Sequence, residues 1–567
     1  MLTYILLAVL NVPLVYLLYL TFIQPRINPL RNLPGPLSKG LFKDQLGMVM
    51  NPSVSPRTHE HFVKTYGRNV MIRGLLPWDQ RLFTLDPVTL AHVMKHSHIY
   101  EKPWQSRRLI TGLIGCGMLA AEGTVHKLQR RVATPAFSVQ NMRELVPLVF
   151  AKGDELKEKW TELIREADKQ HTGGAEKTSG HPAGLKLDVC HWVSRATFDV
   201  IGSAGFDYQF NAIQNETNEL FNAYKEMFEV AISQQSGALR SLAVIYFPIL
   251  ETLFPNKATY TVRRCQEVIR RVAGNLIQEK KRKIAEAEAE GKTYQGKDLL
   301  SLLLKSNAAA DLPPEQRISD ADILHNINTF MFAGSDTSSL AITWMLYLLA
   351  RYPTVQARLR AELRALLPPT PLAALTPDEV SRLYAGIAEL PFLENVIREA
   401  MRLIPPVHSS ARVATRDDVL PAATPVPTRM PDGSVREVRE VRVPKGAFIH
   451  VPVEGFNLDR EVWGPDGWAF KPDRWNNLPE AVASQPGLYN NTLSFSAGPR
   501  SCIGMRFSII EIKTFLFILL THFTFAEADE KVGKANVVLT RPYVVGKHMA
   551  GSQCPLLVTP YVQEGAQ

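Results

Sequence analysis

Cysteine is scarce in this sequence and never forms a metal-binding pair. The chain of 567 residues has five cysteines, and none of them belongs to a C-x-x-C motif. Their spacing argues against zinc sites and disulfide frameworks, so the sequence fits a reducing compartment. No internal repeat recurs along the chain either, which argues against a solenoid fold.

Nucleic-acid-binding motifs are also absent, although the chain carries a formal net charge of +9. A positive balance suits nucleic acid, an anionic membrane or an acidic protein partner. Without a nucleic-acid motif, the membrane and the acidic protein are favoured. Flavin and iron–sulfur motifs are missing as well, so any electrons this protein uses must come from a separate protein.

Charge is absent from the N-terminal segment. Leu2 to Ile23 would span about 33 Å as a helix, enough for a bilayer core, and a membrane helix tolerates Asn11 and Pro13 within it. A cleaved signal peptide is the alternative, but no basic residue precedes the run and no small-residue cleavage site follows it. Arg26 and Arg31 come next, so the positive-inside rule keeps the rest of the chain cytosolic. The expected division is a single-pass transmembrane anchor over 1–24, a proline-rich hinge and linker over 25–50, and one large domain over 51–567.

Helical periodicity fills most of the remaining sequence, and the apolar runs typical of strands are short and few. The longest predicted helix opens with a Ser-x-x-Asp capping box at Ser319 and stops before Pro353. Alternating residues between Thr415 and Lys445, around an Asp-Gly pair, predict a β-hairpin. The expected fold class is therefore mostly α with small β-sheets (α+β).

One cysteine lies in a stretch whose other residues suit a metal-bound sulfur, Phe495-Ser-Ala-Gly498-Pro-Arg500-Ser-Cys502-Ile-Gly504. Gly498 permits a tight turn, and Gly504 leaves room for backbone to approach a flat group. Arg500 offers a planar cation to a carboxylate, and Phe495 would keep water from the sulfur. A helical pattern follows at once, so Cys502 lies at a helix N-terminus, which stabilises a thiolate. The alternative is a buried free cysteine beside a glycine-rich turn.

This stretch matches the pattern F-x-x-G-x-R-x-C-x-G at each defined position, and so resembles the cytochrome P450 family of haem-thiolate monooxygenases. The resemblance implies haem b as the cofactor, Cys502 as its axial iron ligand and Arg500 as a partner of a haem propionate. It extends from the turn at Pro34 to the end of the chain. The implied fold is that of the family, carried behind the N-terminal anchor.

A basic segment near residue 126 adds to this resemblance. His126 and Arg130 are four residues apart and share a helical face, with Lys127 and Arg131 on the adjacent face. Taken alone, this pattern indicates a solvated basic helix. In the family, an aromatic residue or histidine followed by arginine binds the propionates here, so the resemblance assigns that role to His126 and Arg130, and also to Arg412. Many members have tryptophan where His126 stands.

The middle of the longest predicted helix contains poor helix formers, Ala333-Gly334-Ser335-Asp336-Thr337. Such a weak point is either a packing kink or a groove opened for a small ligand. The stretch matches the family pattern A-G-x-D-T, which implies that Asp336 and Thr337 relay protons to dioxygen at the haem. Four residues are expected to line the substrate pocket: Phe330, Ala333, Gly334 and Val407.

A second predicted helix begins at Pro391 and carries Glu399 and Arg402 three residues apart. Most E-x-x-R matches are surface pairs that stabilise little. Here the neighbouring residues are apolar enough to bury the pair, and burial requires further hydrogen bonds. The family resemblance supplies a third member, Arg474, and implies a structural role for the three residues in bracing the cysteine loop.

The chemistry implied by the resemblance is insertion of one oxygen atom from O2 into a lipophilic substrate, such as a terpenoid or another secondary metabolite. Similarity to membrane-bound eukaryotic members implies electrons from an NADPH-dependent flavoprotein reductase and a site on the cytosolic side of the endoplasmic reticulum membrane. A haem-thiolate isomerase or dehydratase acting on peroxides is the nearest alternative. Asp336 and Thr337 argue against it, because such an enzyme needs no proton relay for O2. A haem electron carrier or gas sensor would not explain the long apolar helices.

Overall fold

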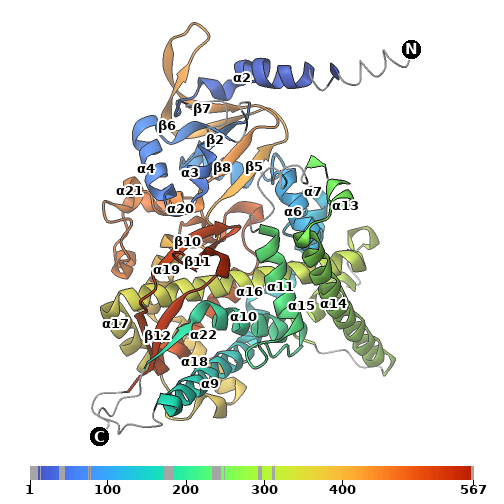
Figure 1. The fold of residues 1–567 in the computed structure, drawn as a ribbon, viewed down its shortest axis with the longest axis vertical. Coiled ribbons are helices and arrows are strands. Elements are labelled where there is room, and N and C mark those ends of the chain that lie inside the picture. The colour runs from blue at the N-terminus through green and yellow to red at the C-terminus, as the bar shows by residue number, and fades with distance from the viewer. Residues whose placement is uncertain are drawn as a thin grey trace. The chain divides into compact units, whose positions relative to one another are not determined.

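The computed structural model describes residues 11–12, 15–37, 45–74, 76, 78–171, 184–232, 240, 244, 246–247, 249–290, 296–308 and 313–562. The chain forms two compact units (Figure 1). Unit 1 comprises Met1–Pro103, Val407–Ala469 and Leu478–Cys502, and unit 2 comprises Trp104–Pro406, Phe470–Asn477 and Ile503–Gln567. The division falls directly after Cys502.

Unit 1 is built on a five-stranded sheet with the strand order β1-β2-β8-β5-β3. Its strands are β1 (Asn69–Arg73), β2 (Gln80–Thr84), β3 (Tyr100–Glu101), β5 (Ser410–Ala414) and β8 (Phe448–Val451). The pair β2–β8 is parallel and the other pairs are antiparallel. Apolar side chains such as Leu82 and Ile449 are fully buried in the sheet's core. Helices of this unit are α2 (Gln24–Ile27), α3 (Leu46–Met50), α4 (Ser55–Tyr66), α5 (Pro87–Lys95), α20 (Val453–Asn457) and α21 (Arg460–Trp463).

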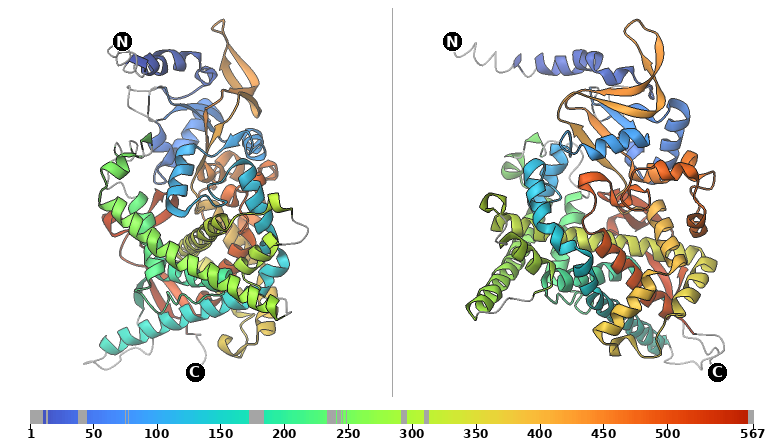
Figure 2. Two further views of the ribbon diagram at one scale, coloured as in Figure 1. Left: turned by 90° about the vertical axis from the view of Figure 1, so that its right-hand side faces the viewer. Right: turned by 180° about the vertical axis from the view of Figure 1, so that it is seen from behind.

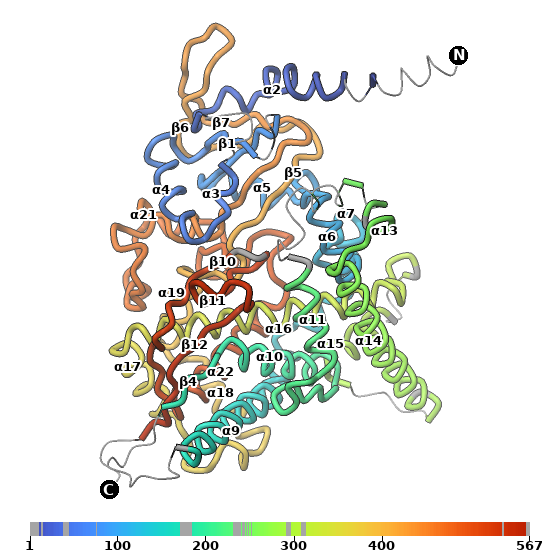
Figure 3. Tube along the Cα trace, viewed as in Figure 1, coloured from blue at the N-terminus to red at the C-terminus, as the bar shows by residue number. Residues whose placement is uncertain are grey.

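The predicted hairpin is confirmed as β6 (Asp418–Arg429) and β7 (Val435–Val443), which Figure 3 traces as a long loop extending from unit 1. The strand register shifts between Pro421 and Val426. Asp86, which is fully buried, accepts hydrogen bonds from the backbone N–H groups of Ala423 (2.9 Å) and Thr424 (3.2 Å) in this irregular stretch. The same carboxylate caps the N-terminus of α5. One side chain therefore fixes the irregular middle of β6.

Helices dominate unit 2. They are α6 (Trp104–Ile114), α7 (Gly123–Ala133), α8 (Val139–Glu144), α9 (Val146–His171), α10 (Val189–Phe206), α11 (Glu219–Ile232), α13 (Ile249–Leu253), α14 (Lys257–Ala289), α15 (Leu299–Ala308), α16 (Asp320–Arg351), α17 (Pro353–Arg364), α18 (Pro377–Ala388), α19 (Pro391–Leu403) and α22 (Met505–His522). A three-stranded sheet has the order β4-β12-β9, formed by β4 (Leu185–Asp188), β12 (Pro555–Pro560) and β9 (Phe523–Glu527). Strands β10 (Val532–Val537) and β11 (Leu539–Val544) pair separately. The prediction of a mostly helical fold with small sheets is confirmed.

The longest predicted helix is α16, which runs across unit 2 and packs against α10 and α22 (Figures 1 and 2). Its capping box is formed as expected, because the Ser319 side chain accepts from the Asp322 N–H and the Asp322 side chain accepts from the Ser319 N–H. The helix continues for 32 residues without interruption. The A-G-x-D-T residues of the candidate site are therefore carried on one continuous helix.

The predicted anchor over 1–24 falls largely outside the described residues. Its described part is helical, including Tyr19–Ile23, and exposes apolar side chains such as Tyr16 and Phe22. Among the described residues, no helix combines the length and apolar character that a bilayer crossing requires. The anchor stays a prediction.

Candidate active site

The cysteine loop belongs to unit 1 and is held by its own backbone. The N–H of Cys502 donates to the carbonyl of Phe495 at 3.0 Å, and Phe495 is buried against the ring of Tyr489. Gly498 has φ +66°, and a Cβ atom there would lie 2.4 Å from the carbonyl oxygen of Met94. A glycine is therefore required at this turn, as the sequence predicted.

Cys502 differs from the other cysteines in its exposure. Its side chain is exposed, whereas Cys190, Cys265 and Cys554 are buried. Burial raises the pKa of the Cys190 thiol to about 12 and raises the pKa of Cys554 well above its ordinary value. These buried thiols are poor metal ligands, because a thiolate is the ligating form. Cys502 is the sulfur best placed to bind a metal.

The segment after Cys502 begins unit 2 and starts α22, with Gly504 at the N-cap. The first helical hydrogen bond runs from the Ser508 N–H to the Gly504 carbonyl at 2.9 Å. At Gly504, the nearest described atom to an added Cβ would be Phe137 Cε1 at 3.9 Å. This leaves open space beside the backbone, which suits the approach of a flat group.

Arg412 provides a test of whether these residues fit a haem. It lies on β5 and is 5% exposed, and its Nη1 donates to Ser410 Oγ (2.5 Å) and to the Ala411 carbonyl (2.8 Å). Burial lowers its pKa to about 10, and no carboxylate among the described residues pairs with it. A buried guanidinium without an anion is costly. An anionic group such as a haem propionate would compensate it, so the donor set fits haem.

The predicted basic helix is confirmed as α7. His126 is buried and Arg130 half-buried, while Lys127 and Arg131 on the adjacent face are exposed. The burial of His126 and Arg130 distinguishes them from a fully solvated basic face. Their propionate roles, like that of the half-buried Arg500, stay predictions.

The A-G-x-D-T segment lies in the middle of α16. The Thr337 hydroxyl donates to the Ala333 carbonyl at 2.8 Å, within the helix itself. A Cβ atom on Gly334 would approach Ile201 Cδ1 of α10 to 2.9 Å, so this glycine also allows close helix packing. Ala333, Gly334, Asp336 and Thr337 are all half-buried, although most of the surrounding helix is buried.

Asp336 has a partner that the sequence analysis missed. Arg541 on β11 pairs with it through both nitrogens, with Nη1 3.2 Å from Oδ1 and Nη2 in contact with Oδ2. Burial alone would lower the pKa of Arg541, but Asp336 raises it above its ordinary value. The two residues are 205 positions apart and share no motif, so the sequence gives no signal for this pair.

A pocket of about 60 Å³ in unit 2 includes this ion pair. Lys225 and Glu229 of α11 line it together with Asp336 and Arg541, and burial raises the pKa of Glu229. The volume is enough for several water molecules. Water in this pocket can therefore reach the Asp336 side chain.

The structure brings the predicted three-residue group together in unit 2. Glu399 and Arg402 are both 0% exposed, and their side chains form two hydrogen bonds of 2.8 and 2.9 Å. Arg474 Nε lies 3.3 Å from Glu399 Oε1. Two further donors were not predicted, the indole of Trp475 (3.1 Å) and the N–H of Lys471 (3.1 Å). Every hydrogen-bonding need of the Glu399 carboxylate is met.

The residues expected to line the substrate pocket are divided between the units. Phe330 is buried on α16 with its ring 5.5 Å from that of Phe137, and Phe332 stacks on Phe228 at 3.9 Å. Val407 is half-buried in unit 1. The aromatic side chains around α16 give this region an apolar character.

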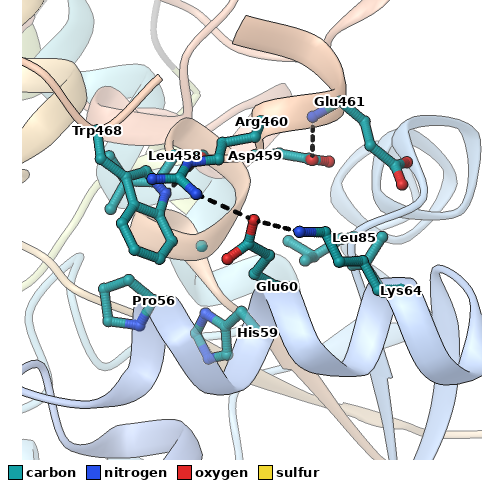
Figure 4. A pocket seen from close by; sticks show the side chains of 12 residues that line it. Pro56, His59, Glu60, Lys64, Leu85, Leu458, Asp459, Arg460, Glu461 and Trp468 are labelled. Atoms are coloured by element: carbon teal, nitrogen blue, oxygen red, sulfur yellow. Dashed lines mark hydrogen bonds and ion pairs between the residues drawn. The ribbon is translucent and has the colours of Figure 1, made fainter. Parts of the chain in front are cut away.

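A second small pocket lies in unit 1, and its lining includes none of the predicted site residues (Figure 4). Glu60 bridges Lys64 (2.8 Å) and Arg460 (3.4 Å) across it, and Trp468 covers one side. The two cations lower the pKa of Glu60. With about 20 Å³ the pocket has room for one water molecule, so it is no substrate site.

Comparison with known proteins agrees with this geometry. Residues 55–543 match the family described as Cytochrome P450. The chain is 37% identical over 552 residues to cytochrome P450 monooxygenase 205 of Postia placenta, covering 95% of this chain and 94% of that protein. It is 34% identical over 550 residues to cytochrome P450 monooxygenase 128 of the same fungus, with the same coverage. A ganoderic acid synthetase of Ganoderma lucidum is 31% identical over 534 residues, 91% of each chain.

Proposed function

Because the chain belongs to the cytochrome P450 family, we propose that it is a haem-thiolate monooxygenase that hydroxylates a lipophilic substrate. One oxygen atom of O2 enters the substrate and the other leaves as water, with two electrons supplied by NADPH through a separate flavoprotein reductase. The observation that carries the proposal is the exposed Cys502 at the start of α22, in a loop fixed by Gly498.

In this proposal the chain's residues have distinct tasks. Cys502 ligates the iron as a thiolate, and Arg412, His126, Arg130 and Arg500 bind the propionates. Bound haem would supply the activation of dioxygen. Asp336 and Thr337 hold and transfer protons from the α16 side, with water reaching Asp336 through the pocket it shares with Arg541.

Substrate class is inferred from the side chains around α16. The buried rings of Phe330 and Phe332 favour an apolar compound, such as a terpenoid or another secondary metabolite. One relative is named a ganoderic acid synthetase, so compounds on the route to ganoderic acid belong in a binding screen. The screen measures the Soret shift that accompanies displacement of water from the iron. A shift with small hydrophilic acids, and none with lipophilic compounds, would contradict the apolar pocket.

Membrane association is part of the same proposal. We infer a single-pass anchor in the endoplasmic reticulum membrane, with the catalytic domain on the cytosolic side. The exposed apolar side chains of the N-terminal segment support it, as do those at and beside α13 in unit 2: Phe247, Ile249, Leu253 and Phe254. Carbonate extraction of the full chain from microsomes tests the anchor, and release of the protein into the supernatant would contradict it.

The ligand assignment is tested by Cys502→Ser and Cys502→Ala. Both variants should lose the reduced carbon monoxide band typical of thiolate ligation, together with all product formation. Cys116→Ser is the matched control and should keep both. Retained turnover in either Cys502 variant would contradict the assignment. Turnover of a peroxide without NADPH would instead indicate the isomerase or dehydratase alternative.

A further inference from the structure

A polar contact joins α22 to α16 in the interior of unit 2. Ser508 Oγ of α22 lies 3.1 Å from Ser338 Oγ of α16. Ser338 directly follows Thr337, and α22 begins three residues after Cys502. The contact therefore connects the helix that follows the predicted iron ligand to the segment predicted to transfer protons.

Glu511 lies on the same stripe of α22, three residues after Ser508. Its side chain is 0% exposed, in a helix whose neighbours Ile512, Phe515 and Leu516 are also fully buried. Neither carboxyl oxygen has a hydrogen bond of ordinary geometry among the described residues, although the Ser338 hydroxyl lies near enough to act on the carboxyl. A buried polar group of this kind is rare in native proteins and points to a role for the group.

The surroundings of Glu511 disfavour its ionised form. Burial raises the pKa of Glu511 well above its ordinary value of 4.5, and the nearby Ser338 hydroxyl opposes this only in part. The elements packed against α22, including α9, α16 and α17, bring no charged group among the described residues that acts on this carboxyl. Lys513 of the same helix is engaged elsewhere, with its Nζ 2.7 Å from the Ala388 carbonyl and 2.8 Å from Glu394.

Glu511 is also poorly placed to exchange protons with water. It is fully buried, and it does not line the pocket of about 60 Å³ that includes Asp336. A group that cannot regain a proton from solvent cannot relay one in every catalytic cycle. Its contribution must therefore come from the hydrogen bond that a neutral acid can form.

We propose that Glu511 remains a neutral carboxylic acid in the folded protein and acts as a positioning residue, donating a hydrogen bond to Ser338 and so fixing α22 against α16 next to Thr337. The contact between the two serines gives each hydroxyl one partner. The acid adds a donor that orients Ser338, and it keeps the Thr337 turn of α16 in place. This inference rests on the proposed monooxygenase function for its effect on catalysis, but not for the protonation state of Glu511.

The protonation state is tested by infrared difference spectroscopy on the full-length holoenzyme. We expect a protonated-carboxyl C=O band in the wild type, at neutral and at alkaline pH, that disappears in Glu511→Gln. The difference in unfolding free energy between the two proteins should also change in favour of the variant as pH rises above 4.5, because the unfolded wild type releases a proton that the folded one retains. Absence of the band would overturn the proposal, whatever the enzyme's activity.

The positioning role is tested by the ratio of product formed to NADPH consumed. We expect Glu511→Leu to lower this ratio several-fold and Glu511→Gln to restore most of the loss, because the amide keeps a donor for Ser338. Ser338→Ala should lower the ratio similarly, and the double variant Glu511→Leu/Ser338→Ala should be no worse than either single one. Thr514→Val, at another buried polar position of α22, is the matched control and should keep the wild-type ratio.

Two outcomes would contradict this role. Thr337→Ala removes a hydroxyl of the predicted proton transfer and should uncouple NADPH consumption from product formation. If Glu511→Gln uncouples the enzyme as strongly, then Glu511 transfers a proton and does more than position Ser338. If the double variant shows the sum of the single effects, then Glu511 does not act through Ser338. Should Glu511→Leu fail to fold, Glu511→Gln and Ser338→Ala still carry the test. Failure of the monooxygenase assignment itself would be seen separately, as a wild type without the thiolate carbon monoxide band.

Discussion

Glu399 in α19 and Glu511 in α22 are both 0% exposed glutamates of unit 2, yet they lie in opposite environments. The carboxylate of Glu399 accepts from two arginines, an indole and a backbone N–H. Glu511 has no hydrogen bond of ordinary geometry among the described residues, and the polar group near it is the Ser338 hydroxyl. Burial alone therefore says little about the role of a carboxyl group. Its neighbours decide whether it is an anion that stabilises the fold or a neutral acid that orients a hydroxyl.

Removing the fully hydrogen-bonded carboxylate of Glu399 should have the largest effect on stability. Glu399→Gln removes the carboxylate that pairs with the two buried arginines, Arg402 and Arg474, and we expect the unfolding free energy to fall by about 3 to 5 kcal/mol. Urea denaturation at neutral pH measures it. Glu511→Gln is the matched control, because it replaces a carboxyl group at an equally buried position where we propose the acid is neutral, and it should leave stability unchanged or raise it. Equal losses in both variants would contradict the comparison.

His59 in unit 1 is a buried base, so it shows how burial affects a group whose protonated form is positively charged. Burial, aided by His408, lowers the pKa of His59 from 6.5 to about 3, although Glu454 opposes the shift. His59 is therefore neutral in the folded protein. The stability that depends on its neutral form is fully present above pH 6.5 and is lost as the pH falls towards 3.

We expect the wild type to lose up to about 1.4 kcal/mol per pH unit below 6.5 relative to His59→Gln, which keeps a donor for the Val49 carbonyl. Unfolding curves collected across this range measure the difference. Parallel curves for the two proteins would show that His59 is protonated without cost in the fold. Glu511 should show the reverse trend, with its cost increasing as pH rises.

The environment of Asp336 is intermediate between those of the two buried glutamates, because Asp336 is half-buried and pairs with one arginine, Arg541. Arg541→Lys keeps the charge but loses the two-nitrogen contact. We expect the yield of product per NADPH to fall by roughly tenfold, because Asp336 is no longer held in one orientation. Arg351→Lys, in an exposed ion pair with Glu527 at the end of α16, is the control and should have no effect. An unchanged yield in Arg541→Lys would show that the pair is only structural.

The exposed charges of α7 should have the smallest effect. We expect Lys127→Glu combined with Arg131→Glu to slow reduction by the flavoprotein reductase by roughly threefold to tenfold at low salt, and less at high salt. Stopped-flow reduction measures this rate, with dithionite as the reductant control. Equal slowing with dithionite would indicate damage to haem binding at the neighbouring His126 and Arg130.

Local patterns predicted much of this molecule. The capping box at Ser319 predicted the start of α16, and the alternating residues before Lys445 predicted the β6–β7 hairpin. Both patterns depend only on residues close together in the sequence. The cysteine loop and the Glu399 group were found from short motifs. Arg541 was missed because its pairing with Asp336 depends on how distant segments fold together. Glu511 left one weak signal, a lone acidic residue in an apolar helix, and its role depends on partners that only the tertiary structure shows.

The β6–β7 hairpin has a further consequence through its attachment at Asp86. That carboxylate accepts hydrogen bonds from Ala423 and Thr424 in the irregular stretch and also caps α5. It therefore attaches the middle of β6 to the N-terminus of α5. Beyond this point the strands stay paired from Val426–Val438 to Arg429–Val435, and the turn at Gly433 is exposed. The outer hairpin is thus an exposed extension held together by its own strand pairing. For engineering, it offers a place to graft an epitope or shorten the chain without disturbing the sheet below.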